Sequence, residues 1–221
     1  MAANSLLLLP GMGADARMFQ PQFEAFPELQ VPAWIPPEPR ETLLHYAERM
    51  AERVHLPSDA SIGGASFGGV VALEMAACLS IPKCILIGSL RSPAGLRRSY
   101  LRLRSLSGCS TFAPLAARAC VGTAGLLCGS TLRGVLRQLA AADGRFLSWA
   151  VRALLEWNPS VKIAGVSIRQ IHGQRDWLLP ARISQADLIV PRAGHLLSLT
   201  HPDEVNAFIK GRDRDDQDFL C

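Results

Sequence analysis

Residues 61–79 read SIGGASFGGVVALEMAACL, and this stretch decides the fold class of the 221-residue chain. It begins with small and apolar residues, turns at the GASFG motif of residues 64–68, and continues with apolar residues at helical spacing. The order predicts a buried strand, a sharp turn and a helix. Because Gly64 and Gly68 flank Ser66, the strand and helix can approach closely and expose the serine hydroxyl at the carboxyl edge of a sheet.

Short apolar runs on either side of this stretch predict further strands. Segments with helical spacing separate several of these runs. Strands that alternate with helices are typical of a parallel sheet covered on both faces. We therefore expect an α/β protein with a mostly parallel sheet of about six strands flanked by helices. The expected strands are 5–9, 31–35, 59–65, 83–87, 166–172 and 186–190, and the expected helices are 16–26, 41–54 and 67–79.

Residues 91–159 interrupt this alternation because they contain no strand pattern. Apolar residues over 130–142 have helical spacing, and Asp143 is a suitable N-cap for a further helix. We expect this segment to be a helical cap, or lid, inserted into a core that residues 1–90 and 160–221 form.

Composition and charge exclude several classes of protein. With 49% hydrophobic and 19% charged residues, the chain is typical of a folded globular protein rather than a disordered one. The formal net charge of +4 is too small for a dedicated nucleic-acid binder. The charge is nevertheless uneven, because residues 91–152 contain ten arginines and a single acid, Asp143, which places +9 on that segment and −5 on the remainder.

Two interpretations of this arginine-rich segment stay open. The arginines can form the solvated face of amphipathic cap helices. Alternatively they recognise an anionic partner, since clustered guanidinium groups suit carboxylates and phosphates. An acidic carrier protein, an anionic substrate or an anionic lipid surface would fit, whereas nucleic acid is not favoured because no aromatic residues are interleaved with the arginines.

The cysteine pattern and hydropathy bear on compartment and cofactors. Six cysteines show no CxxC pair and no metal-ligand spacing with histidine, so they indicate thiols in a reducing cytoplasm and neither a zinc site nor another cofactor. No apolar run approaches the length of a membrane span, and the leucines near the N-terminus lack the preceding positive charge of a signal peptide. We expect a cytoplasmic protein.

A serine hydroxyl needs a general base and an acid that orients the base. His195 follows the last expected strand in a loop at the carboxyl edge, whereas its rival His201 precedes a helix start. Asp176 lies four residues beyond the strand that ends at His172, at the same edge, and His172 itself is expected to be packed. The order Ser66, Asp176, His195 is that of a nucleophile-elbow hydrolase.

Two backbone N–H groups are needed to stabilise an oxyanion. Phe67 follows the expected nucleophile directly and supplies one. Met12 in the loop after the first strand can supply the other, with glycines at positions 11 and 13 allowing a close approach.

With these residues in place, the chain resembles the α/β-hydrolase superfamily, in particular its small serine esterases with a helical cap. The resemblance covers residues 6–209 in element order and places Ser66, Asp176 and His195 at the family's triad positions. Two departures are Pro10-Gly11 where many relatives have His-Gly, and the absence of an opening hairpin, which suggests a minimal sheet.

The resemblance implies hydrolysis of carboxylic esters of small to medium acyl chains through an acyl-enzyme intermediate. A serine at the elbow separates the chain from the dehalogenases and epoxide hydrolases of the superfamily, which carry aspartate there. Several other activities of the superfamily use the same triad and oxyanion donors and stay open: thioesterase, lactonase, peroxide-forming and carrier-linked acyl ester hydrolase. The non-enzyme alternative is a catalytically silent binding module on a hydrolase fold.

Overall fold

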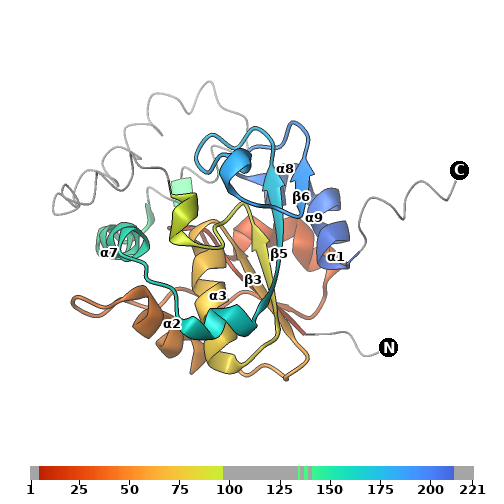
Figure 1. Ribbon diagram of the computed structural model, residues 1–221. Helices are drawn as coiled ribbons and strands as arrows, with labels where there is room; N and C mark the ends of the chain where they lie inside the picture. Colours follow the sequence, from red (N-terminus) through yellow and green to blue (C-terminus); the bar gives the residue numbers. More distant parts are fainter. Residues whose placement is uncertain (1–4, 97–133, 135–136, 139–140, 212–221) are drawn as a thin grey trace, which may run out of the picture.

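A six-stranded parallel sheet forms the centre of the protein, seen in a computed structural model that describes residues 5–96, 134, 137–138 and 141–211 (Figure 1). The strand order is β2-β1-β3-β4-β5-β6. All five strand pairs are parallel, so the expected α/β class and strand number are confirmed. The strands are β1 (Leu6–Leu9), β2 (Leu29–Gln30), β3 (Ser61–Ala65), β4 (Lys83–Ile87), β5 (Ser167–Gly173) and β6 (Leu188–Val190).

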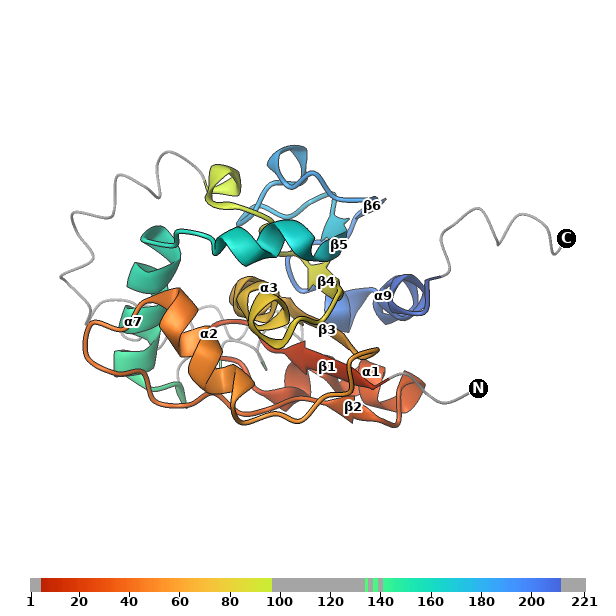
Figure 2. The same ribbon diagram turned by 60° about the horizontal axis from the view of Figure 1, so that its bottom comes forward.

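Helices cover both faces of the sheet (Figures 1 and 2). One face carries α2 (Leu43–Ala51) and α3 (Phe67–Leu79), and α7 (Gly144–Leu155) packs against α2. The other face carries α1 (Gln20–Ala25), α8 (Leu197–Thr200) and α9 (Pro202–Ile209), which contact one another. The apolar side chains accordingly form two buried clusters, one on each side of the sheet. Short 3-10 turns complete the fold: η1 (Ala16–Phe19), η2 (Pro93–Gly95), η4 (Val161–Gly165) and η5 (Ala181–Ile183).

The second strand is the main error of the sequence prediction. We expected a strand over 31–35, but β2 is the two-residue Leu29–Gln30, and the chain from 31 to 38 has no sheet partner. Pro32 has no N–H to donate to a ladder. Instead, the Tyr46 hydroxyl accepts a hydrogen bond from the Ile35 N–H at 3.1 Å and donates one to the Ile35 carbonyl at 2.9 Å, which satisfies this backbone without a strand.

Side-chain caps set the starts of two helices. The helix expected over 41–54 is shorter, because the Thr42 hydroxyl accepts from His45 N at 3.2 Å and starts α2 at Leu43. The Asp143 carboxylate accepts from Arg145 N at 2.9 Å, which confirms Asp143 as the N-cap of α7.

Most of the expected cap lies outside the described residues. Six of the arginines lie in the range 97–133, which the structure does not describe: those at 97, 98, 102, 104, 118 and 133. Of the helix predicted over 130–142, only residues 134, 137–138 and 141–142 are described. Helix α7 is the part of the segment 91–159 that the structure describes most fully. Among the described helices, none is long and apolar enough to cross a membrane.

Candidate active site

Ser66 lies at the turn between β3 and α3 in a strained backbone conformation. Its φ of 52° and ψ of −123° lie in a region that residues with a side chain rarely adopt. The neighbouring glycines make the turn possible. A Cβ on Gly64 would lie 2.5 Å from the carbonyl carbon of Gly68, and a Cβ on Gly68 would clash with the Pro10 carbonyl oxygen. The strand, the helix and the loop after β1 therefore meet at Ser66.

His195 and Asp176 lie beside this serine, as the order of the motifs predicts. The Ser66 Oγ is 2.9 Å from Nε2 of His195, and Nδ1 of the same ring is 2.7 Å from Oδ2 of Asp176. Because an ionised carboxylate can only accept, Nδ1 of His195 donates to it. Nε2 is then left as the acceptor for the Ser66 hydroxyl proton.

Asp176 is almost fully buried, with 4% of its surface exposed, yet both of its carboxylate oxygens accept hydrogen bonds. Oδ1 accepts from the backbone N–H groups of Leu178 at 3.0 Å and Leu179 at 2.8 Å. Burial on its own would raise the pKa of this carboxyl. The hydrogen bonds from His172 and His195 outweigh burial and hold the pKa of Asp176 well below its usual range, so the group is an anion.

The loop after β1 lies against the serine and carries the expected oxyanion donor Met12. A Cβ on Gly11 would be 3.8 Å from the Ser66 Cβ, and Gly13 has a φ of 71° that favours glycine. The Gly11 N–H donates to the Met18 sulfur at 3.2 Å. The N–H groups of Met12 and Phe67 donate to no other residue that the structure describes.

Phe67 belongs to a cluster of five aromatic rings that sequence reasoning did not find. The centroid of the Trp34 ring lies 5.7 Å from that of Phe67 and 5.4 Å from that of Phe146. Tyr46 and Trp149 complete the cluster. These residues come from the segment after β2 and from α2, α3 and α7, so only their shared position in the fold unites them. The aromatic signal in the sequence was the pair Phe146 and Trp149 on one face of α7.

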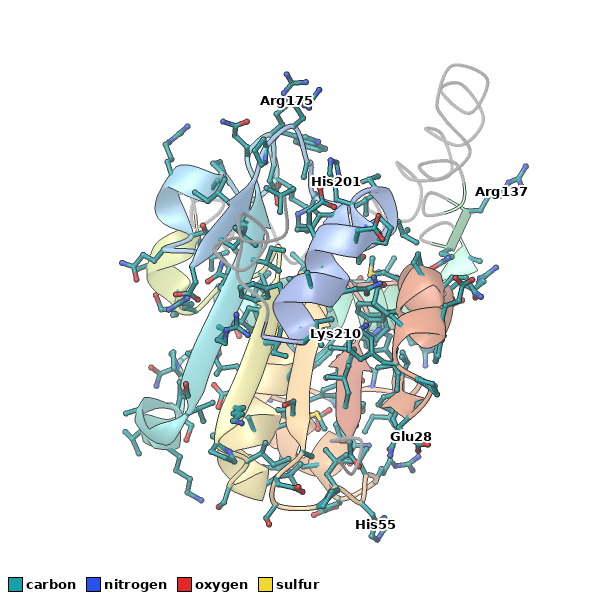
Figure 3. All side chains as sticks on the ribbon, turned by 90° about the vertical axis from the view of Figure 1, so that its right-hand side faces the viewer. Glu28, His55, Arg137, Arg175, His201 and Lys210 are labelled. Atoms are coloured by element: carbon teal, nitrogen blue, oxygen red, sulfur yellow. The ribbon has the colours of Figure 1, made fainter. Side chains whose placement is uncertain are left out.

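Three further histidines, including the rival His201, differ from His195 in position or in contacts. His201 lies at the start of α9 with its Nδ1 2.9 Å from the Thr200 hydroxyl. Figure 3 shows His55 at the opposite end of the sheet from Arg175, the residue next to Asp176. His172, expected to be packed, is fully buried but contacts Asp176 at 3.3 Å.

Among the described residues, one group of side chains has the composition and spacing of potential metal ligands. Glu38, Glu41 and His45 place their ligand atoms within 4.8 Å of one another. However, the Arg49 guanidinium is 2.9 Å from Glu41 and 3.3 Å from Glu38, so both carboxylates already pair with a cation. This group therefore reads as an ion-pair network around the start of α2.

Comparison with known proteins shows the fold. No protein-family model and no curated protein matches this chain. Among solved structures, it is similar to a thermophilic esterase from Thermogutta terrifontis, with a TM-score of 0.72 and 20% identity over 94% of this chain and 88% of that one. It is also similar to MenH from S. aureus, with a TM-score of 0.72 and 15% identity over 98% and 96% of the two chains.

A carboxylesterase structure from Nitrososphaera gargenis is similar at a TM-score of 0.69 and 16% identity, over 95% of this chain and 89% of that chain. The chain therefore has the α/β-hydrolase fold, as the resemblance of its motifs implies, and its structural neighbours include esterases and a hydrolase at low identity.

Proposed function

We propose that this protein is a serine hydrolase that cleaves carboxylic esters of small to medium acyl chains. The observation that carries the proposal is the continuous line of hydrogen bonds from the Ser66 hydroxyl through His195 to the Asp176 carboxylate, at 2.9 Å and 2.7 Å. This is the arrangement in which a histidine removes the proton of a serine while an anion stabilises the imidazolium that forms.

The reaction would proceed in two halves. His195 Nε2 takes the Ser66 proton while Oγ attacks the ester carbonyl carbon, and the carbonyl oxygen becomes an oxyanion that the Met12 and Phe67 N–H groups stabilise. The protonated His195 then gives its proton to the departing alkoxide, so an alcohol leaves and the acyl group stays on Ser66. In the second half a water molecule loses a proton to His195 and attacks the acyl carbon, and the carboxylic acid leaves as the proton returns to Ser66.

The aromatic cluster favours an apolar group near the serine. The Trp34 and Phe146 rings pack against Phe67, and the Trp34 side chain is only partly buried. We infer that its accessible part borders the space for the acyl chain. Thioesters and lactones present the same carbonyl to Ser66, so they are the first alternatives among substrates.

Hydrolysis of p-nitrophenyl acetate and butyrate tests the proposal. Wild type should turn over both esters and should be labelled covalently by a fluorophosphonate probe, and Ser66→Ala should abolish turnover and labelling. Ser61→Ala, on the same strand, is the matched control and should keep both.

The two readouts separate the alternatives. Covalent labelling without ester turnover would redirect the search to thioesters and lactones. Absence of labelling and of turnover with all three substrate classes would favour the catalytically silent binding module.

The arginine content of residues 91–152 supports an anionic group on the substrate, such as an ester carried by an acidic protein. Reversal of charge at Arg97 and Arg98 together should then raise KM for a carrier-linked ester and leave KM for p-nitrophenyl butyrate unchanged. Equal effects on the two substrates would contradict an anionic substrate.

A further inference from the structure

A second histidine lies behind the Asp176 carboxylate and takes no part in the steps above. His172 is on β5 and is fully buried. Its Nε2 is 2.6 Å from the Leu179 carbonyl oxygen and 3.3 Å from Oδ2 of Asp176. The same Oδ2 accepts from His195 on its other side. Two histidine rings therefore converge on one carboxylate oxygen.

The neighbours of His172 determine which of its nitrogens carries the proton. Arg91 Nε lies 2.9 Å from one atom of the Gln170 side-chain amide. A guanidinium group can only donate hydrogen bonds, so this amide atom must be the oxygen. The Gln170 NH₂ group then donates to the Ser89 carbonyl at 2.9 Å and to Nδ1 of His172 at 3.3 Å. A carbonyl can only accept, so Ser89 requires the same orientation of the amide.

Nδ1 of His172 must consequently be the acceptor, and Nε2 must carry the hydrogen. A second proton on Nδ1 would face the Gln170 NH₂ group, donor against donor. The Nε2 hydrogen points to the Leu179 carbonyl and the Asp176 carboxylate, which are both acceptors. Every polar atom of the ring is satisfied by the neutral Nε2–H tautomer.

Arg91 itself is held in place from the far side. Its Nη2 forms an ion pair with Asp187, and the same carboxylate oxygen accepts from the Gln170 backbone N–H at 2.7 Å. Gln170 is thus fixed through its backbone and through both ends of its side chain.

We propose that His172, held as the Nε2–H tautomer by Gln170 and Arg91, is a positioning residue that fixes the Asp176 carboxylate for His195. The inference deepens the proposed function and rests on it. The His172 hydrogen binds both ends of the loop from Asp176 to Leu179, and the Leu179 N–H in turn binds Asp176 Oδ1 at 2.8 Å. The carboxylate cannot rotate away from His195 without breaking these bonds.

The same Gln170 amide also reaches the nucleophile. Ser89, whose carbonyl accepts from Gln170, donates its hydroxyl to the Ser66 carbonyl at 2.6 Å. One buried amide therefore connects the strained backbone of Ser66 with the histidine behind Asp176.

The tautomer can be measured without any activity. In ¹⁵N-labelled wild type, long-range ¹H–¹⁵N correlation spectra should show Nδ1 of His172 unprotonated and Nε2 protonated at neutral pH. An Nδ1–H or doubly protonated ring would overturn the proposal. This readout is independent of whether the protein hydrolyses esters, so it also decides the matter if the proposed function fails.

A matched pair of variants tests the positioning role. In His172→Gln the side-chain amide can reach the position of Nε2 and donate to Asp176, whereas in His172→Asn it reaches only the position of Nδ1. Loss of a hydrogen bond to a charged group corresponds to about a tenfold or larger change in rate. We therefore expect His172→Asn to lower kcat for p-nitrophenyl butyrate about tenfold at unchanged KM, and His172→Gln to recover most of the loss.

A second signal separates positioning from general loosening of the fold. The proton that His195 shares with Asp176 should exchange with solvent faster in His172→Asn than in wild type or His172→Gln. If Asn and Gln variants have equal kcat and equal exchange, His172 does not position the acid. If wild type lacks esterase activity altogether, the esterase proposal fails while the tautomer and the exchange comparison still stand or fall on their own.

Discussion

Trp157 Nε1 donates a 2.7 Å hydrogen bond to Oε1 of Glu74, a carboxyl that is fully buried in α3, the helix that begins next to Ser66. The Ser160 N–H donates to the same oxygen at 3.2 Å. The other oxygen, Oε2, has no hydrogen-bond partner among the residues described. Burial is the main cause that raises the pKa of Glu74, and the two donated hydrogen bonds only partly oppose it.

Glu74→Gln should therefore change how stability depends on pH. A carboxyl with a raised folded pKa favours folding when protonated, so the contribution of Glu74 to the stability of wild type should be lost as the pH rises above about 4.3, the ordinary glutamate pKa, through the folded pKa. The glutamine can keep both donated hydrogen bonds and does not ionise. Urea unfolding at several pH values should show the free energy of unfolding of the variant rising relative to that of wild type toward neutral pH. Glu28→Gln, at an exposed position far from α3 in the sequence, should show no such trend, and a pH-independent difference between Glu74→Gln and wild type would contradict the role of Glu74 burial.

Asp176→Asn should lower kcat by about 10⁴-fold, because an amide NH₂ can favour the wrong tautomer of His195. Since the folded pKa of Asp176 is depressed, its anion stabilises the fold above about pH 3.9 and that contribution is lost as the pH falls below this value. The stability difference between wild type and variant should therefore shrink in acid. Steady-state rates and acid unfolding curves measure the two effects, and an unchanged kcat would remove Asp176 from the mechanism.

Gly68→Ala should affect both stability and rate. The added Cβ would clash with the backbone oxygens of Leu9 and Pro10, so α3 and the loop that carries Met12 must separate. Overpacking of this kind costs about 1–3 kcal/mol, and the displaced loop should lower kcat. Gly165→Ala is the control because nothing lies within 4 Å of its Cβ, and there both quantities should stay near wild type. A normal kcat in Gly68→Ala would show that this contact does not place the loop.

Phe146→Ala should destabilise the protein by about 3 kcal/mol, since it removes a buried ring from the aromatic cluster around Phe67. Val151→Ala on the same helix is the control, because that side chain is 36% exposed and its truncation should cost less than about 1 kcal/mol. Chemical denaturation of both variants measures the contrast. Equal losses would mean that α7 is held by something other than the cluster.

The sequence predicts elements that depend on residues close together in the chain, and it fails where residues far apart in the chain interact. The strand over 83–87 and the helix over 67–79 match the structure because each is defined by its own residues, a short apolar run in the strand and a longer apolar stretch after the turn in the helix. The strand over 31–35 failed because its apolar residues pack without a ladder and Tyr46, distant in sequence, satisfies the backbone of Ile35.

The candidate site shows the same division. Ser66, Asp176 and His195 follow strand ends, so their meeting at one edge could be expected from topology. The contact of His172 with Asp176 could not, since it depends on a rotamer and on a buried amide that Arg91 orients. The aromatic cluster joins four separate segments, and the pair Phe146 and Trp149 on α7 is the only part of it that one segment reveals.

The two outermost strands, β2 and β6, are only two and three residues long. An unpaired strand edge is a template for another chain, and long flat edges promote aggregation. Here each margin of the sheet exposes few unpaired backbone groups, so strand addition by a neighbouring molecule would gain little. Short strands at the margins thus leave little backbone for self-association, while the longer strands β3, β4 and β5 stay inside, with Ser66 directly after β3 and Asp176 shortly after β5.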